Sequence, residues 1–335
     1  ASNGYLASQF VNPQGNKRSD EYGCNTENRS RFLQEVIDSI RRQTGSEFVL
    51  GLRICSREMD EQGLDIEHTL AACKKLQEQL DYISITAGTS ASLGGAVHIV
   101  PPMTVANAYV APDSKRFREA LNIPVMVAGR INQLQEAEQI LEKGEADMVG
   151  MTRALICDPL MPSKAQSGQG DTIRACIACN QACIGHFHKG LPISCIQHPE
   201  TGRELDYGFD EVPLAATPKQ IMVVGGGPAG LKAASIAAQA GHKVTLYESA
   251  SQLGGQVLLA QKIPGRAEFG GLITNLQHEA ERSGVSVVRN TVVNRELVKN
   301  QSPDVVIIAT GAKPFMPEFE QMGSMKVLDP WQVLS

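Results

Sequence analysis

The sequence lacks a long hydrophobic run, an excess of basic residues and an apolar leader-like segment. Its longest apolar stretches, such as 221–224 and 305–309, are far too short to cross a bilayer, so we predict no membrane partner. Lysine and arginine number 31 against 36 acidic residues, a formal charge of −5, which disfavours a nucleic-acid partner. Residues 1–15 are mixed and polar, unlike a signal peptide, and we expect a cytoplasmic protein.

Disulfides are also unexpected, although the chain has eight cysteines, because the cytosol keeps thiols reduced. Four cysteines are scattered, and we expect structural roles for them: Cys24, Cys55, Cys73 and Cys157. The other four fall together within 176–195, and this clustering requires a separate explanation. With 42% hydrophobic and 20% charged residues over 335 positions, the chain otherwise has the composition of a globular protein of about two domains.

Residues 32–155 alternate short apolar runs with helix-like segments. Continuous apolar strands separated by helices are typical of parallel strands covered on both faces. The pattern therefore predicts an α/β unit in which each strand ends in polar or glycine residues. Strands are predicted at 48–54, 82–86, 124–128 and 146–151, and helices at 65–80 and 133–143. A second α/β unit is predicted with strands at 221–224, 243–247 and 304–309 and a helix over 229–240.

The second unit begins with a glycine-rich turn between a strand and a helix. Gly225 permits the tight turn, Gly227 lets the backbone approach a pyrophosphate, and Gly230 allows close packing of the helix. Free N–H groups at the helix N-terminus would bind the anion. Glu248 closes the next strand, where its carboxylate would bind a ribose diol and favour FAD or NAD over NADP. Gly311, in a turn after the late strand, would approach the same nucleotide or would simply end the strand.

The clustered cysteines have the spacing Cys176-x2-Cys179-x3-Cys183-x11-Cys195. Three close thiolates and a fourth that returns after a loop can surround one [4Fe–4S] cubane, with one iron per sulfur. Zinc is the main alternative, but zinc sites usually pair two Cys-x2-Cys knuckles, and here the second half is a single cysteine. A third alternative leaves the four cysteines unligated in a core. Nearby histidines are interpreted as surface or supporting groups, namely His186, His188 and His198.

Arginines follow three of the strands predicted in the first unit. Arg130 comes directly after Gly129 at one strand end, and the stretch Gly150-Met-Thr152-Arg153 ends the next. In an eight-stranded βα barrel, the loops after the last two strands commonly form a phosphate site, which here would suit FMN. Arg53 ends an earlier strand, where a guanidinium beside flavin N1 would stabilise the anionic reduced ring. A single strand-end arginine is more often a surface residue, so the prediction depends on the three together.

Several stretches resemble the 2,4-dienoyl-CoA reductase and trimethylamine dehydrogenase family, whose barrel is related to the old yellow enzymes. The resemblance covers nearly the whole chain and is most specific in the cysteine block, where three residues separate Cys179 from Cys183 as in the reductase branch. The matching stretches are Ser2-Asn-Gly-Tyr-Leu6, Lys17-Arg-Ser-Asp-Glu-Tyr-Gly23, Glu27-Asn-Arg-Ser-Arg-Phe32, Gly150-Met-Thr-Arg153, Cys176-Ile-Ala-Cys179-Asn-Gln-Ala-Cys183, Leu253-Gly-Gly-Gln256 and Ile263-Pro-Gly-Arg-Ala-Glu-Phe269.

The resemblance implies an α/β protein with FMN in a (β/α)8 barrel, a [4Fe–4S] cluster at the barrel edge, FAD or ADP in a Rossmann-like domain, and NAD(P)H as electron donor. It also places Gly255 and Gln256 beside the second nucleotide. The domains are predicted as the C-terminal half of the barrel at 1–165, the cluster segment at 166–200, a linker at 201–218 and an incomplete Rossmann-like domain at 219–335.

By the same resemblance, the chain starts after the fourth barrel strand and ends where an NAD(P)-binding insertion would begin. Half a barrel leaves open strand edges, which expose backbone groups and favour aggregation. We therefore expect the isolated chain to be unstable and inactive. The resemblance leaves a homo-oligomer open.

The implied chemistry is NAD(P)H-dependent reduction of an activated C=C bond in an enoyl or dienoyl thioester or an enone. Hydride would pass from nicotinamide to FAD, then as single electrons through the cluster to FMN, which would reduce the β-carbon. Tyr5 would protonate the α-carbon, because its phenol can donate a proton opposite the flavin. Asn3 would bind the substrate carbonyl and stabilise enolate charge. A tyrosine buried for packing is the alternative interpretation of Tyr5.

Two departures from the family pattern leave the substrate open. Asn3 stands where the dienoyl reductase and the amine dehydrogenase usually carry histidine, and the loop 87–92 lacks the histidine of one and the acid and aromatics of the other. An alternative is therefore an N-methyl amine dehydrogenase or demethylase, in which electrons run from the amine to FMN and the cluster, with His98 near the substrate. A third alternative is a non-catalytic module that only binds nucleotide and cluster.

Overall fold

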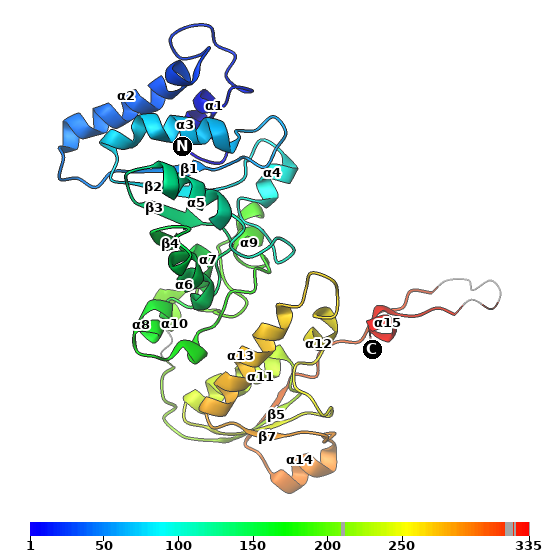
Figure 1. Ribbon diagram of the computed structural model, residues 1–335. Coiled ribbons are helices and arrows are strands. Elements are labelled where there is room, and N and C mark those ends of the chain that lie inside the picture. The colour runs from blue at the N-terminus through cyan, green and yellow to red at the C-terminus, as the bar shows by residue number, and fades with distance from the viewer. Residues whose placement is uncertain (209–211, 319–323, 325, 335) are drawn as a thin grey trace. The chain divides into compact units, whose positions relative to one another are not determined.

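The computed structural model describes residues 1–208, 212–318, 324 and 326–334, and the chain forms two compact units (Figure 1). The first unit contains residues 1–159 and 178–189, and the second contains residues 160–177 and 190–335. Each unit is built on one four-stranded parallel sheet, as the apolar strand pattern predicts. The predicted α/β class, with a barrel segment followed by a Rossmann-like domain, is confirmed.

The first unit has the strand order β1-β2-β3-β4, in which neighbours in sequence are neighbours in the sheet. Its strands are β1 (Gly51–Cys55), β2 (Tyr82–Thr86), β3 (Val125–Ala128) and β4 (Met148–Gly150). Its helices are α1 (Leu6–Val11), α2 (Thr26–Thr44), α3 (Ile66–Leu76), the 3₁₀ turn η1 (Gln77–Gln79), α4 (Leu93–Val97), α5 (Ala111–Ala120), α6 (Leu134–Glu142), α7 (Thr152–Cys157) and α9 (Ile184–His188).

Side-chain caps begin the longer helices of the first unit. The Asn25 side chain accepts a hydrogen bond from Asn28 N at the start of α2, and Asp65 accepts one from His68 N at the start of α3. Helix α2 ends at Gly45, whose φ of 78° suits glycine. These local signals explain why the helices between the strands are found where the sequence predicts them, although predicted helix 65–80 ends in a 3₁₀ turn.

Alternate residues of the first sheet form the core of the first unit. Ile54, Ile85 and Val127 are fully buried in a cluster that also contains Leu33 of α2 and Phe117 of α5. Figure 1 shows α2, α3 and α5 grouped against this sheet. The residues between these apolar positions point to the opposite face, because side chains alternate along a strand.

The second unit has the strand order β7-β6-β5-β8, so the chain moves outward from β5 to β7 and then returns to the other side of β5. Its strands are β5 (Gln220–Val224), β6 (Lys243–Tyr247), β7 (Ser286–Val288) and β8 (Val305–Ile308). Its helices are α8 (Met161–Gln166), the 3₁₀ turn η2 (Gly170–Thr172), α10 (Glu204–Tyr207), α11 (Pro228–Gln239), α12 (Val257–Ala260), α13 (Phe269–Arg282), α14 (Arg295–Gln301) and α15 (Pro330–Leu334).

Helices α11 and α13 pack together beside the second sheet (Figure 1). Leu231 of α11 and Leu246 of β6 are fully buried, and Leu276 of α13 is nearly so. Strand β7 and helix α13 are absent from the sequence-based prediction, while the segment predicted as a linker contains α10. No helix in the described ranges combines the length and apolarity that a membrane span requires.

Candidate functional site

The glycine-rich turn after β5 has the backbone geometry expected of a dinucleotide-binding loop. Gly225 has a φ of 107°, and a Cβ there would lie 2.4 Å from the carbonyl oxygen of Ala309. A Cβ on Gly230 would lie 1.9 Å from the carbonyl oxygen of Gly225, so α11 packs directly on the turn. A Cβ on Gly227 would meet no described atom within 4 Å. Gly227 therefore leaves open space at the N-terminus of α11, where a phosphate can approach.

Glu248 follows β6 and joins that strand to the glycine turn. Its side chain is buried, and Oε2 accepts a hydrogen bond from Gly226 N at 2.7 Å. Oε1 accepts hydrogen bonds from Ala250 N at 2.7 Å and from Ser249 Oγ at 3.0 Å. Two carboxylate oxygens offer about four acceptor positions, so one remains for a ribose hydroxyl. These donors also keep the carboxylate oriented at the strand end.

A cavity of about 840 Å³ borders the carboxyl ends of the strands in the second sheet. This volume lies within the range of cofactor sites, about 300–1,000 Å³. Gln256 Nε2 donates to the carbonyl oxygen of Ala312 at 2.9 Å, which joins the loop before α12 to the segment after β8. The structure brings six predicted nucleotide residues together in its wall, namely Gly225, Gly227, Glu248, Gly255, Gln256 and Gly311. The glycine cradle and the oriented carboxylate fit an ADP moiety, and Gly230 supports them from behind.

Arg53 lies on the face of the first sheet that is opposite its apolar core. In the strand register Arg53 pairs with Ser84, Ser84 with Met126, and Met126 with Met148, so the four residues form one row across the sheet. Ser84 is 5% exposed, yet its Oγ has no hydrogen-bond partner within the described ranges. A guanidinium and an unsatisfied hydroxyl beside two methionines fit the polar edge and the apolar face of a flavin ring.

The strand-end arginines of the first unit make contacts within the protein. Arg130 is 5% exposed with a φ of 50°, and its guanidinium donates to the carbonyl oxygen of Val105. Arg153 Nη1 donates at 2.7 Å both to the carbonyl oxygen of Pro101 and to Asn180 Oδ1. The arginines are therefore held in place by the loops at the carboxyl edge of the sheet. Their predicted contact with an FMN phosphate stays a prediction.

The glycines that precede these arginines lie in close contact with neighbouring side chains. A Cβ on Gly129 would lie 2.4 Å from Val110 Cγ2, so packing requires glycine there, whereas a Cβ on Gly150 would lie 3.2 Å from Ala128 Cβ, a tight contact that a small shift could relieve. Thr152 is exposed at the first position of α7, two residues after Gly150. The structure thus places all five predicted phosphate-site residues at adjacent strand ends, because Ala128 of β3 pairs with Gly150 of β4.

Asn3 is buried at the carboxyl edge of the first sheet and binds the protein itself. Its Nδ2 donates to the carbonyl oxygens of Ala87 and Gly88, each at 3.2 Å, and its backbone N donates to Cys55 Sγ at 3.1 Å. Burial raises the pKa of the Cys55 thiol to about 11. Asn3 therefore joins β1 to the loop after β2. Tyr5, in contrast, is 66% exposed just before α1, so it is not the buried packing tyrosine of the alternative interpretation.

The predicted cluster ligands are half-buried thiols that are divided between the two units. In the first unit, Asn180 lies between Cys179 and Cys183, and its Nδ2 donates to the carbonyl oxygen of Val100 at 2.8 Å. Asn180 has a φ of 56°, and its Oδ1 accepts from Arg153 as described above. These bonds fix the segment that carries Cys179 against the carboxyl-edge loops of the first sheet.

In the second unit, a separate hydrogen bond joins the segments that carry Cys176 and Cys195. Gln197 Nε2 donates to the carbonyl oxygen of Ala175 at 2.9 Å, and Gln197 Oε1 accepts from Asn275 of α13 at 3.3 Å. Within the described residues, no group of three or more His, Cys, Asp or Glu side chains is arranged to hold a metal ion. The four-thiolate ligand set has the donor chemistry of an iron–sulfur site and stays a prediction.

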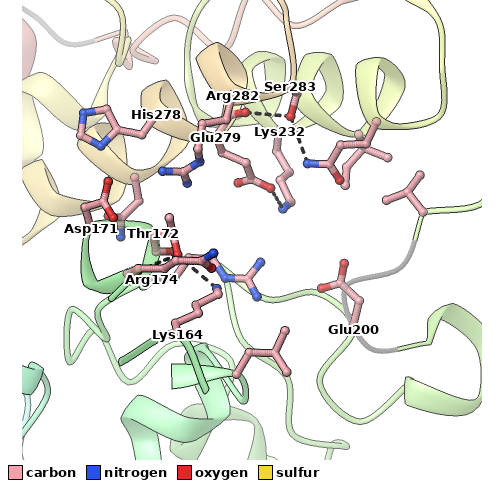
Figure 2. A pocket seen from close by; sticks show the side chains of 16 residues that line it. Lys164, Asp171, Thr172, Arg174, Glu200, Lys232, His278, Glu279, Arg282 and Ser283 are labelled. Carbon is pink, nitrogen blue, oxygen red and sulfur yellow. Dashed lines mark hydrogen bonds and ion pairs between the residues drawn. The ribbon is translucent and has the colours of Figure 1, made fainter. Parts of the chain in front are cut away.

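Figure 2 shows another cavity of the second unit, of about 580 Å³, with walls from η2, α11 and α13. Lys232 of α11 and Glu279 of α13 form an ion pair of 2.6 Å on one wall of this cavity, with side chains 20% and 16% exposed. Four cationic side chains in its lining face three carboxylates, so the charges nearly balance: Lys164, Arg174, Lys232 and Arg282 against Asp171, Glu200 and Glu279. The predicted site residues, all of which are described, line other parts of the molecule.

Three residues that the structure places at these sites carry no local signal in the sequence. Cys55 was expected to be merely structural, and it contacts Asn3. Ser84 and Asn180 lie in a strand and a loop whose patterns do not distinguish them from neighbouring polar residues. Ser84 could have been indicated only by its pairing with Arg53 in the neighbouring strand. Asn180 could have been indicated only by its place between Cys179 and Cys183.

Two family models match the chain, one in each half. The NADH:flavin oxidoreductase / NADH oxidase family model matches residues 1–172, and the pyridine nucleotide-disulphide oxidoreductase model matches residues 219–332. These ranges correspond to the two parallel sheets and leave the cysteine segment between them. The matches agree with a flavin-type barrel segment followed by a nucleotide-binding domain.

Similar proteins include both amine dehydrogenases and reductases. The chain is 35% identical over 340 residues to an N,N-dimethylglycine/sarcosine dehydrogenase of Chromohalobacter salexigens, covering 99% of this chain and 49% of the relative. It is 37% identical over 314 residues to a multifunctional alkene reductase/demethylase of Caballeronia cordobensis, covering 93% and 45%. A 2-naphthoyl-CoA reductase structure superposes with a TM-score of 0.88 at 32% identity, covering 94% and 48%. The chain thus spans about half the length of the relatives it matches.

Proposed function

The chain belongs to the NADH:flavin oxidoreductase / NADH oxidase family, and from this premise we propose that the whole protein reduces an activated C=C bond at the expense of NAD(P)H. When bound, FMN, a [4Fe–4S] cluster and FAD would supply hydride transfer and single-electron transfer between the nicotinamide and the substrate. The substrate class is an enoyl or dienoyl thioester or an enone.

The hydrogen bond between Arg153 and Asn180 is the observation that carries the electron-transfer part of the proposal. Arg153 follows β4, at the edge of the sheet that carries Arg53, and Asn180 lies one residue after the predicted ligand Cys179. The contact of 2.7 Å brings the part of the cysteine segment that carries Cys179 to the proposed flavin edge of the first sheet. Electron transfer to or from the flavin requires such proximity, whereas a purely structural metal site has no need of it.

Tyr5 is the proposed proton donor. Its exposed phenol can reach a bound substrate without first breaking a buried contact, and it would protonate the α-carbon. Asn3 is the proposed donor to the substrate carbonyl. In the structure both Nδ2 hydrogens of Asn3 are engaged by Ala87 and Gly88, so this role requires exchange of one of these bonds for the substrate. Until then Asn3 positions the loop after β2.

Anaerobic stopped-flow spectroscopy of the intact protein tests the direction of electron flow. Flavin bleaching by NADH or NADPH alone, followed by reoxidation with an enone, is the expected result. The variant Tyr5→Phe should keep the first step and slow the second at least about tenfold, because general acid catalysis contributes about 10²–10⁴ in rate. Bleaching by N-methylated amines but by neither nicotinamide would replace the reductase with the alternative below.

An N-methyl amine dehydrogenase is the second candidate, favoured by the 35% identity to an N,N-dimethylglycine/sarcosine dehydrogenase. His98 was considered as a substrate contact for this activity. Its Nδ1 lies 2.9 Å from the carbonyl oxygen of Gly94, and its ring lies 5.8 Å from that of Tyr109. Both contacts hold the histidine within its own loop, so an amine would have to be recognised by other groups unless the loop rearranges.

A further inference from the structure

The order of strands in the second sheet divides its cavity into two halves. The cavity wall includes Thr291 after β7, Glu248 after β6, Gly225 after β5 and Thr310 after β8, so it borders all four strand ends. The chain reverses direction across the sheet between β5 and β8, since β8 pairs with the side of β5 that β6 leaves unoccupied. Ligands of open parallel sheets bind across such a reversal.

One half of the cavity suffices for an ADP moiety. Glu248 would bind the ribose at the end of β6, and the glycine turn would bind the pyrophosphate at the end of β5. Thr291 N donates to the carbonyl oxygen of Glu248 at 2.9 Å, which keeps the segment after β7 beside the ribose position. A ligand that ended at the pyrophosphate would leave the β8 half of the cavity empty.

The wall of this cavity also includes Trp331, the single tryptophan of the chain. Asp329 Oδ1 accepts from Trp331 N at 2.8 Å and so caps the start of helix α15. At the other end of the helix, Lys262 Nζ donates to the carbonyl oxygen of Leu334 at 2.6 Å and joins α15 to the segment after α12. Lys262 follows α12, and Gln256, which directly precedes α12, lines the β8 half of the cavity. Trp331 therefore shares the wall of the β8 half with Gln256 and Gly311.

We propose that Trp331 stacks on the isoalloxazine ring of FAD and so makes the second unit specific for FAD rather than ADP. The inference rests on the proposed function, in which this domain holds a flavin dinucleotide, and it decides between the two nucleotides that the sequence leaves open. An aromatic pair contributes beyond its buried area, and an indole presents a large, rigid face to a flat ring. ADP has no ring on this side of its pyrophosphate and gains nothing from Trp331.

Affinity measurements on the nucleotide-free protein test the proposal. Isothermal titration with FAD and with ADP is compared between the wild-type protein, Trp331→Phe and Trp331→Ala. A stacking contact of about 0.5–1.5 kcal/mol corresponds to about two- to tenfold in Kd. We expect Trp331→Ala to weaken FAD by at least this factor and to leave the Kd of ADP unchanged, while Trp331→Phe retains most of the FAD affinity.

Flavin fluorescence gives an independent readout of contact. An indole in contact with an isoalloxazine quenches flavin emission by electron transfer, and phenylalanine does not. Bound FAD should therefore be brighter in Trp331→Phe than in the wild-type protein, at nearly equal occupancy. Phe315→Ala is the matched control, because Phe315 also follows β8 but is 87% exposed and lies outside the cavity lining. It should change neither the affinity nor the emission.

Two results would overturn the proposal in different ways. Equal losses of FAD and ADP affinity in Trp331→Ala, or no loss of either, would remove the role of Trp331 and leave the nucleotide site intact. Failure of both nucleotides to bind the wild-type protein, with no further effect of Glu248→Ala, would remove the nucleotide site itself and the role of Trp331 with it.

Discussion

The two sheets have the same number of strands and the same parallel pairing, but the chain passes through them in different orders. In the first sheet each strand is added to the same edge, and in the second sheet the chain reverses between β5 and β8. The reversal creates a crevice at the strand ends, and the second unit accordingly has a cavity lined by residues that follow all four of its strands. Strand order thus accounts for the position of the second unit's cavity, which borders the ends of all four strands.

The first unit holds its predicted site residues differently. Arg53 and Ser84 lie on one face, while Arg130, Arg153 and Asn3 are tied to carbonyl oxygens of loops at the carboxyl edge. These residues are positioned by hydrogen bonds between loops that are far apart in the sequence. The second unit relies instead on close backbone packing around glycines. The two units should therefore respond to substitution in different ways.

The largest effect is expected at Gly230. Alanine there would place a Cβ 1.9 Å from the carbonyl oxygen of Gly225, and the backbone on both sides cannot move without separating α11 from β5. We expect Gly230→Ala to destabilise the second unit by about 3 kcal/mol or more and to abolish nucleotide binding. Urea unfolding followed by hydrogen exchange in each unit measures this loss, and the first unit should be unaffected.

Gly227→Ala is the matched control for this substitution. A Cβ at Gly227 meets no described atom within 4 Å, and its φ of −74° suits alanine. The variant should keep the stability of the second unit within about 0.5 kcal/mol and lose only nucleotide affinity. Equal destabilisation by both substitutions would contradict the distinct packing and ligand-facing roles of the two glycines.

The stability of the first unit should depend on the ionisation of Cys55 in β1. The second sheet has no counterpart, because strands β5–β8 contain no cysteine. Burial raises the pKa of Cys55 from 9.0 to about 11, so between these values the unfolded chain binds fewer protons than the folded one. The free energy of unfolding should therefore fall as the pH rises from 9 to 11, by about 2–3 kcal/mol for this thiol.

Denaturant unfolding of the wild-type protein and Cys55→Ser over pH 7–11 measures the Cys55 contribution. Serine does not titrate in this range, so the free energy of unfolding should decrease less with pH in the variant than in the wild-type protein. Burial also raises the pKa of Cys73, to about 12, and its contribution should remain in the variant. Identical pH slopes for the two proteins would show that Cys55 is ionised in the folded state as readily as in the unfolded one.

A smaller loss of stability is expected when the segment that carries Cys179 and Cys183 loses its side-chain hydrogen bonds to the rest of the first unit. Asn180→Gly permits the φ of 56° and removes the side-chain bonds to Val100 and Arg153. Two hydrogen bonds, one of them to a charged group, correspond to about 2 kcal/mol. We expect residues 178–189 to exchange amide hydrogens faster, while the second unit keeps its protection.

Asn290→Gly controls for the change of backbone freedom. Asn290 has a φ of 54° in the second unit, and its exposed side chain makes no hydrogen bond to the described residues. This variant should change the stability by no more than about 0.5 kcal/mol. A comparable loss in both variants would assign the effect at Asn180 to glycine entropy rather than to its contacts.

The smallest effect concerns one Lys–Glu pair between neighbouring helices in each unit. Lys232 and Glu279 join α11 to α13 with side chains 20% and 16% exposed, whereas Lys75 and Glu27 join α3 to α2 with side chains 34% and 74% exposed. Double-mutant cycles should give a coupling of about 1 kcal/mol for the first pair and about 0.3 kcal/mol or less for the second. Equal couplings would contradict the dependence on burial.

Local features of both units could be predicted from the residue pattern alone. Apolar runs located β2 and β6 at their observed bounds, and the glycine spacing identified the turn after β5, because such patterns report the demands of one strand or one turn. Arg53, Glu248 and the glycines could be predicted for the same reason. Strand β7 (Ser286–Val288) is absent from the prediction although β4, which is equally short, is included in it.

Contacts between residues far apart in the sequence became apparent only in the folded chain. Asn3 contacts Ala87, Arg153 contacts Asn180, and Trp331 shares a cavity wall with Gly225, although many residues separate the members of each pair. No local pattern encodes such contacts, because they depend on strand order and on how loops pack at the end of a sheet. A side chain's neighbours along the strand follow from alternation alone, whereas its neighbours across the sheet follow from the path of the whole chain.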